Sequence, residues 1–518
     1  MKALLKGALR QALRSWPEAT VVLVFVTSRL VWRTVFDLRF DASPVFGFLQ
    51  YLDPWFVEHD FLRSVLYLHH QAPLQILLVQ GCMRILGAAA AFVVLEALYI
   101  ALGFLLAIAL LRVLRSLGSP ALLSSVAVSL YTASPTSAVY ENWLFYHLPT
   151  AALLVFSLGA LLRLYRRGTA GSAFLFFALV ATVALVRSTF GLLFLGAAVA
   201  IVLTRPPHPC RQGVLSRRTI VKAAMLPLLV VALNSARTRV LVGHDYGSAL
   251  LWVNLSNKIF GYVPSSEANR LTSKGLLSGA ARYEGPVTEV SAYGQFQIAH
   301  APTGVPLLDL DSVPGGGHNP HALEHVLVAE RYYRQDAIYL LTHYPRAYLR
   351  SVWDGLSSGY VSSATRTLEF SRQMNYRRLR RLESYLDRAL GRFADGRLLL
   401  LMVGLPLAVL YGFRRVRCAR SRCESERSSV AAVSYMLLAI AYVTGVTVLV
   451  SYADFGRYRF DIDPLYLVLS VLLLRDIGGV ARRVWRGYGS WGQATIPQQT
   501  PQIADVSPTG GAHLRRSQ

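Results

Sequence analysis

The sequence predicts an all-α polytopic membrane protein with about ten transmembrane helices, or roughly 8 to 13, and an extracytoplasmic mixed domain inserted between the spans. Of its 518 residues, 53% are hydrophobic and only 16% are charged, which is more apolar than a soluble chain of this length. The mean hydropathy is +0.39. Several apolar runs approach the roughly 20 residues that cross a bilayer.

The positive charge of the chain indicates its orientation in the bilayer. The formal net charge is +24, which by itself could indicate nucleic acid. The basic residues instead cluster in short segments between apolar runs, as the positive-inside rule expects for cytoplasmic loops. We therefore expect a lipid bilayer and no nucleic acid as partner, a bacterial plasma membrane as location, and both termini in the cytoplasm. The basic segments are 2–14, 163–167, 211–222, 414–427 and 475–486.

The spans follow in order from these loops. The first is expected to be uncleaved, because no small-residue cleavage site follows it. The run 172–204 has cytoplasmic flanks on both sides and predicts a hairpin of two short helices with Arg187 at the outer tip. A shorter helix over 73–87 is expected at the outer interface, where Arg84 can reach the headgroups. The remaining spans are predicted at 20–36, 90–111, 120–135, 147–163, 223–241, 397–413, 430–451 and 464–480.

These spans divide the chain into four parts. Residues 1–241 form an N-terminal transmembrane module whose first outer loop, 37–72, is acidic. Residues 242–396 form an extracytoplasmic domain with interfacial helices, since they contain no clear 20-residue apolar run. Residues 397–486 form a C-terminal transmembrane module. The polar tail 487–518 is predicted to be a disordered cytoplasmic segment.

Unusual polar groups from distant parts of the sequence fall on the predicted outer side. Carboxylates gather in the first outer loop, and arginines lie in later outer loops. A carboxylate can accept a proton from a hydroxyl, and arginine can hold a phosphate by charge-assisted hydrogen bonds. The arrangement suits transfer of a sugar from a lipid phosphate. The groups are Asp53, Glu58, Asp60, His69, His70, Glu141, Asn142, Arg187, Lys258, Arg457 and Arg459.

Four segments resemble the C-type (GT-C) superfamily of polyprenyl-phosphate-sugar-dependent membrane glycosyltransferases. Within it, the chain is most similar to bacterial protein O-mannosyltransferases and lipid A aminoarabinose transferases. The acidic first loop ends in a His-x-Gln-Pro-Pro-Leu-like turn, in which Ala72 replaces the first of the two usual prolines. The segments are His69-His70-Gln71-Ala72-Pro73-Leu74, Tyr140 to Tyr146, Leu185 to Ser188, and Arg457 to Pro464.

The resemblance implies an inverting transfer in which the first-loop Asp53 deprotonates the acceptor, with Glu58 and Asp60 as further catalytic candidates. A helix cap is the alternative for Asp53, because Asp before Pro is a good helix start. The donor phosphate is expected at Arg187, Arg457, Arg459, His69, His70 and Lys258. Arg187 could instead sit at the interface, and Arg457 and Arg459 could instead pair with Asp454, Asp461 or Asp463. Glu141 and Asn142 are expected on the acceptor side.

No cofactor is expected, although a divalent metal is an open alternative. Two groups could hold one: His59, His69 and His70 with Glu58 or Asp60, or His318, His321, Glu324 and His325 on one helix face. The expected partners are a polyprenyl-phosphate sugar, of the hexosyl or mannosyl type, and a glycan, lipid or protein acceptor. A transporter or lipid flippase is the main competing interpretation, followed by an oligosaccharide ligase or polymerase.

Overall fold

The computed structural model describes residues 2–207, 215–243, 250–283, 285–360, 405–418, 424–452 and 455–491. These residues form helices, turns and isolated bridges. The predicted class, an all-α polytopic membrane protein, is confirmed. Among the described residues, five helices are long and apolar enough to cross a membrane. They are α6 (Ala88–Ser116), α9 (His147–Arg167), α12 (Arg217–Val242), and the segments Glu426–Val450 of α22 (Glu424–Val450) and Asp463–Ala481 of α24 (Asp463–Trp491).

Several shorter helices complete the apolar part of the molecule. The predicted hairpin over 172–204 is confirmed, because α10 (Ala170–Val186) ends immediately before Arg187 and α11 (Leu192–Thr204) follows it. The helix predicted at 73–87 is α5 (Pro73–Leu86), which Pro73 opens at its first position. The first predicted span lies within α1 (Lys2–Thr34), and α7 (Ala121–Ala133) covers most of the third.

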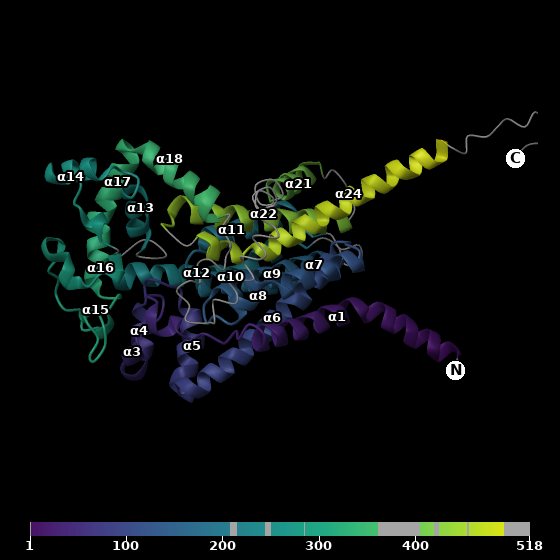
Figure 1. Ribbon diagram of the computed structural model, residues 1–518, viewed down its shortest axis with the longest axis horizontal. Coiled ribbons are helices and arrows are strands. Elements are labelled where there is room, and N and C mark those ends of the chain that lie inside the picture. Colours follow the sequence, from purple (N-terminus) through teal and green to yellow (C-terminus); the bar gives the residue numbers. More distant parts are fainter. Residues whose placement is uncertain are drawn as a thin grey trace, which may run out of the picture. The chain divides into compact units, whose positions relative to one another are not determined.

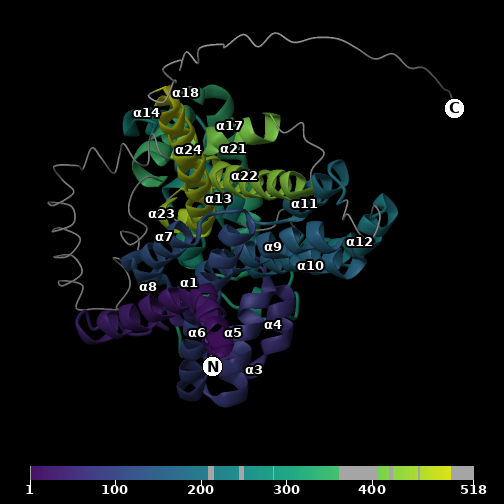
Figure 2. The same ribbon diagram turned by 90° about the vertical axis from the view of Figure 1, so that its right-hand side faces the viewer.

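Helix α9 forms the centre of the core. It packs against α6, α10 and α22 (Figures 1 and 2), and most of its side chains are buried. Its Ser157 hydroxyl lies 2.8 Å from the Leu154 carbonyl and 2.7 Å from the Tyr435 hydroxyl of α22. Helix α12 packs on α10, and α1 packs on α7 and α6.

The first outer loop folds into short helices against later segments. They are α2 (Pro44–Gly47), α3 (Pro54–His59) and α4 (Phe61–Tyr67). The backbone of Asp41 exchanges hydrogen bonds with the segment after α8 (Pro135–Glu141): its N–H donates to the Asn142 carbonyl, and its carbonyl accepts from Leu144. This pairing fixes the start of the loop.

The predicted extracytoplasmic domain, 242–396, is described over 242–243, 250–283 and 285–360, and the two longer stretches are helical with several 3₁₀ and π turns. Two small cores of its own hold it together. Residues 361–404, including the start of the predicted span 397–413, lie outside the described residues; α21 (Leu405–Cys418) follows. The helices of the inserted domain are α13 (Leu250–Phe260), α14 (Ser265–Ser273), α15 (Pro306–Asp309), α16 (Leu323–Val328), α17 (Arg334–His343) and α18 (Pro345–Asp354).

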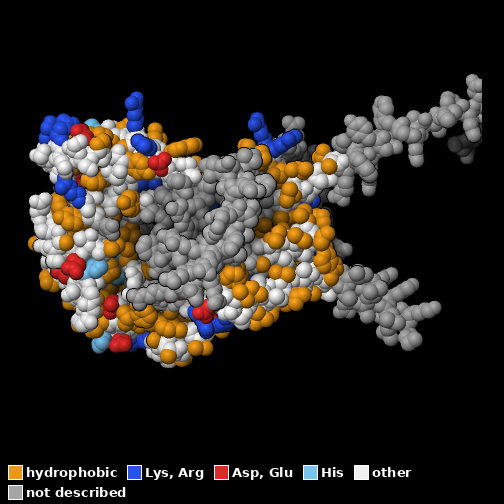
Figure 3. Space-filling view, in the orientation of Figure 1, with side chains coloured by type: hydrophobic (Ala, Val, Ile, Leu, Met, Phe, Trp, Pro, Cys, Tyr) orange, Lys and Arg blue, Asp and Glu red, His pale blue; other side chains and the backbone are white. Residues whose placement is uncertain are grey.

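Residues up to Leu473 form one compact unit. On the face seen in Figure 3, hydrophobic side chains cover the surface over α1 and α7, and charged and histidine side chains gather over the end that holds α3, α14 and α15. This polarity agrees with an apolar bundle in lipid and a polar end in water. A second unit begins at Leu474, and the structure describes it through Trp491 as a continuation of α24. The predicted disordered tail lies almost wholly outside the described residues.

Candidate functional site

A cavity of about 270 Å³ lies between the first outer loop, the α10–α11 turn, α13 and the end of α22. Its size is near the lower end of small-molecule sites, roughly 300–1,000 Å³. Apolar residues of α13 and α22 line it together with polar groups from segments that are far apart in the sequence. The polar groups include Gln50, His70, Gln71, Tyr146, Ser188, Asn254, Thr447 and Tyr458.

Gln71 joins two walls of this cavity. Its side-chain amide donates to the Val186 carbonyl at 3.0 Å, and its amide oxygen accepts from the Ser188 hydroxyl at 3.0 Å. Ala72, which follows, is extended and leads directly into Pro73 of α5. The turn that resembled the glycosyltransferase motif is therefore anchored to the tip of the α10–α11 hairpin, and one proline suffices to open the helix.

Positive charge is concentrated behind one wall. The Arg187 guanidinium carbon lies 4.9 Å from the ring centre of Tyr146 and 4.5 Å from that of Tyr458. Arg457 lies 5.3 Å from the same Tyr458 ring. Burial favours a raised pKa of Tyr458, but the guanidinium groups of Arg457 and Arg187 outweigh it and lower the pKa of this phenol. The wall is thus electropositive and favours an anionic ligand.

Arg187 also belongs to a buried ion pair. Only 1% of it is exposed, and its guanidinium contacts the carboxylate of Asp461, which is fully buried. The same carboxylate lies 2.8 Å from His147 Nδ1 at the start of α9. From the sequence, Asp461 was a candidate partner only for Arg457 or Arg459, and His147 was not among the predicted site residues. The usable signal is that a buried arginine without a counter-charge is costly, so a carboxylate is expected beside a buried Arg187.

The other predicted phosphate ligands have different surroundings. Arg459 donates from Nε to Asp463 at 3.2 Å, which is the alternative that the sequence left open. Arg457 is nearly buried and packs against Tyr458 and Phe145. Lys258 is buried on α13, and its Nζ donates to the carbonyl of Ser451, a residue that lines the cavity. Burial lowers the pKa of Lys258 to about 8. Asp454 lies outside the described residues.

The three catalytic candidates among the carboxylates of the first loop have different surroundings. Asp53 is the N-cap of α3, and its Oδ1 accepts from the N–H of Trp55 at 2.9 Å. It lies three residues after Gln50 of the cavity wall, and three residues span at most about 11 Å. Glu58 is exposed. Asp60 precedes α4, and within the described part of the chain its buried Oδ2 has no hydrogen-bond partner.

Glu141 and Asn142 lie at the end of α8. The buried Glu141 forms a two-point ion pair with Arg29 of α1, with Nε–Oε1 and Nη2–Oε2 distances of 2.9 and 2.6 Å. The Asn142 amide donates to the Ala138 carbonyl at 2.9 Å. These contacts give both residues a packing role between helices, and their predicted role toward an acceptor stays a prediction.

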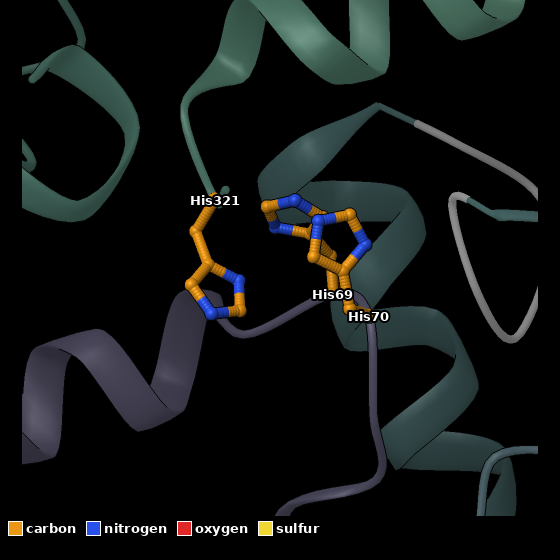
Figure 4. A group of neighbouring side chains, drawn as sticks. All are labelled: His69, His70 and His321. Atoms are coloured by element: carbon orange, nitrogen blue, oxygen red, sulfur yellow. The ribbon is translucent and has the colours of Figure 1, made fainter. Parts of the chain in front are cut away.

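The histidines combine differently from either group predicted by sequence. The expectation that His318, His321, Glu324 and His325 share a helix face is wrong, because α16 begins only at Leu323. His59 stacks on Trp55 at an exposed position. His321 instead lies beside His69 and His70 of the first outer loop (Figure 4). No local pattern links these residues, since about 250 positions separate them.

Comparisons with known proteins add a distant likeness. No protein-family model matches the chain, and no curated protein matches it. Two solved structures, both of ArnT from Cupriavidus metallidurans, are similar. The apo structure shows 14% identity and a TM-score of 0.32, covering 85% of this chain and 78% of that one. The structure bound to undecaprenyl phosphate shows 12% identity and a TM-score of 0.28, covering 83% and 77%.

Proposed function

We propose that the protein is an integral membrane glycosyltransferase that moves one sugar from a polyprenyl-phosphate carrier to an acceptor on the extracytoplasmic face. The observation that carries the proposal is the cavity: its electropositive wall, formed by Tyr458 with Arg187 and Arg457 behind it, faces the end of the first outer loop. None of the three candidate carboxylates of the first loop lines this cavity, but Asp53 lies three residues after Gln50 of its wall. Sugar transfer from a phosphate requires a proton acceptor beside the anion site, and we assign that role to Asp53.

The donor phosphate binds at the electropositive wall. We assign the phosphate to Arg457, which packs on the Tyr458 ring of the cavity wall, and to Lys258, which donates to the carbonyl of Ser451 in the same wall. Arg187 packs against the rings of Tyr146 and Tyr458 and holds them in place. His69 and His70 approach from the first outer loop. Preorganised cations in a water-poor site stabilise the charge that develops on a leaving phosphate.

Asp53 acts as the general base. Capping occupies Oδ1, and a carboxylate has further lone pairs that can accept a proton. It takes the proton of the acceptor hydroxyl as that oxygen attacks the anomeric carbon. The bond from this carbon to the phosphate oxygen breaks, the polyprenyl phosphate leaves, and the configuration inverts. Hexosyl or mannosyl donors are the proposed substrate class.

Transfer assays on purified protein in nanodiscs test this function. Labelled polyprenyl-phosphate monosaccharides are offered with membrane extract as acceptor, to wild type and Asp53→Asn. Asparagine caps a helix as well as aspartate does, so the variant removes the charge and keeps α3. We expect transfer by the wild type and a loss of about 10²–10⁴-fold in the variant.

Glu58→Gln and Asp60→Asn are the matched controls from the same loop. If Asp53→Asn retains full activity and Asp60→Asn loses it, the base is Asp60 rather than Asp53. If no donor supports transfer and the protein instead takes up a specific lipid or solute into proteoliposomes, the glycosyltransferase proposal is wrong. The protein would then be a transporter.

A further inference from the structure

Three buried histidines meet where the first outer loop contacts the inserted domain. His69 and His70 precede α5, and His321 precedes α16. The exposed fraction is 1% for His69, 2% for His70 and 1% for His321. One ligand-capable atom from each lies within 4.8 Å of those from the other two. Figure 4 shows the rings of His69 and His70 coming from one segment and that of His321 from another.

Each imidazole uses one ring nitrogen on a backbone carbonyl. His69 Nδ1 lies 3.1 Å from the Tyr67 carbonyl, and His70 Nε2 lies 2.8 Å from that of Pro320. His321 Nε2 lies 3.2 Å from the Tyr51 carbonyl. A carbonyl only accepts, so these nitrogens carry the protons, and the lone pairs are on Nε2 of His69 and on Nδ1 of His70 and His321. Metal-binding histidines are oriented by hydrogen bonds of this kind.

We propose that His69, His70 and His321 form a three-histidine site for a divalent transition metal of the zinc class. Tetrahedral zinc holds nitrogen at about 2.0–2.1 Å, which places the ligand atoms about 3.4 Å apart. The candidate ligand atoms lie within 4.8 Å of one another, so binding requires the rings to approach by up to about 1.4 Å. Three protein ligands leave the fourth position for water or a substrate oxygen, as in open zinc sites.

The surroundings suit a metal better than a protonated histidine. Burial and the neighbouring His69 and His321 rings keep the pKa of His70 well below its usual value. Burial lowers the pKa of His321 to about 4. The rings of His70 and His321 can therefore stay neutral near pH 7, as metal coordination requires. The Nδ1 atom of His321 is buried and has no hydrogen-bond partner among the residues that the structure describes, which leaves its lone pair for a ligand.

The site would fasten two distant segments beside the cavity. His70 lines the cavity, so a bound cation adds positive charge near the proposed phosphate position. His321 follows the loop in which Gly316 approaches Asp53. A metal ion here would hold the first outer loop against the inserted domain, whatever reaction the cavity supports.

The test is metal binding by full-length protein that carries no histidine tag. Chelator-treated protein is titrated with Zn²⁺ alone by calorimetry, and with Co²⁺ alone to follow the visible absorption of the bound ion. We expect about one equivalent bound and a higher unfolding temperature with metal. The variants His321→Gln, His70→Gln and His69→Asn keep the backbone hydrogen bonds and remove the ligand nitrogens. Each should weaken binding by at least about tenfold.

His59→Gln is the matched control, because His59 is an exposed histidine of the same loop; it should bind metal like the wild type. The proposal is overturned if the wild type binds no Zn²⁺ or Co²⁺, or if the triple variant binds as tightly as the wild type while unfolding at the metal-free wild-type temperature. Because binding is measured without donor or acceptor, a failure here is distinct from a failure of the proposed glycosyltransferase.

Discussion

Asp461 is the residue on which the buried charge of the site depends. It contacts Arg187 and His147 in an environment without solvent access. Asp461→Asn would leave the Arg187 guanidinium buried without a counter-charge, which costs about 3–5 kcal/mol. We therefore expect a large drop in the unfolding temperature of the detergent-solubilised protein, measured by intrinsic fluorescence.

An exposed pair provides the control for this prediction. Asp37 pairs with Arg39, and their side chains are 49% and 71% exposed. Exposed pairs contribute only about 0–1 kcal/mol, so Asp37→Asn should change the unfolding temperature little. Equal effects of the two substitutions would show that the buried Arg187–Asp461 pair contributes no more to stability than the control pair.

Lys258 predicts a pH dependence of donor binding. Its pKa of about 8 means that the ammonium is charged at neutral pH and loses its proton as the pH rises above that value. A phosphate monoester has its second pKa near 6, so its charge is nearly constant above about pH 7. Affinity for a short polyprenyl phosphate should therefore fall by about ten- to a hundredfold between about pH 7 and pH 10, as fluorescence-based binding would measure.

Two substitutions separate this effect from general alkaline damage. Lys258→Arg keeps its charge throughout this range, so its affinity should fall much less than that of the wild type. The remaining fall is the share of Tyr458, a cavity residue whose lowered pKa lets its phenol lose a proton toward pH 10. Lys258→Gln should bind weakly at every pH. If the wild type and Lys258→Arg show the same decline, another group is responsible for it.

At the level of the elements, α8 is held between α1 and α6 by the Arg29–Glu141 pair. Arg29 bonds both carboxylate oxygens and also donates to the Thr132 carbonyl. Glycine at position 103 of α6 leaves room for this carboxylate, because a Cβ there would lie 2.0 Å from Glu141 Oε2. The carboxylate cannot move away without breaking its ion pair. Gly103→Ala should therefore destabilise the fold by about 1–3 kcal/mol.

Gly159→Ala is the matched change in α9. Its added Cβ would meet nothing closer than 3.9 Å, and replacing a helical glycine restricts the unfolded chain. The expected effect is a stabilisation of about 0.4–1 kcal/mol. Both variants can be compared by thermal unfolding in one detergent, and a neutral Gly103→Ala would mean that the α6–α8 contact is looser than the structure shows.

Element types were predictable because local physics decides them. Apolar length and basic flanks predicted the helices and the α10–α11 hairpin, and Pro73 marked the start of α5. The prediction of one helix face from His318 to His325 was wrong, because α16 begins only at Leu323 and helical spacing does not apply to the residues before it. The helix cap at Asp53 was predictable from the proline that follows it.

At the scale of the whole molecule, the site depends on contacts that a single sequence does not encode locally. His147 meets Asp461 across 314 positions, and His70 meets Pro320 across 250. Charge and burial arguments could say that Arg187 needed a partner, but several acidic residues were equally eligible. Only the packing of α9, α10 and α23 (Phe455–Phe460) selects one of them.

The orientation of the molecule in the membrane gives a final prediction. Helix α12 has 26 residues, about 39 Å at 1.5 Å per residue, so its two ends should lie on opposite sides of a bilayer. Basic residues at its start predict a cytoplasmic beginning, and the inserted domain then lies outside. In a cysteine-free background, Ser265→Cys of α14 should react with an impermeant maleimide on intact cells. Arg218→Cys should react only after permeabilisation.

Both positions are exposed, so a lack of labelling cannot be attributed to burial. The background requires replacement of Cys82, Cys210, Cys418 and Cys423. The reverse pattern would place the cavity and its first outer loop on the cytoplasmic side. Acceptors outside the cell membrane could then not reach Asp53, and the proposed direction of transfer would have to be abandoned even if transfer itself were observed.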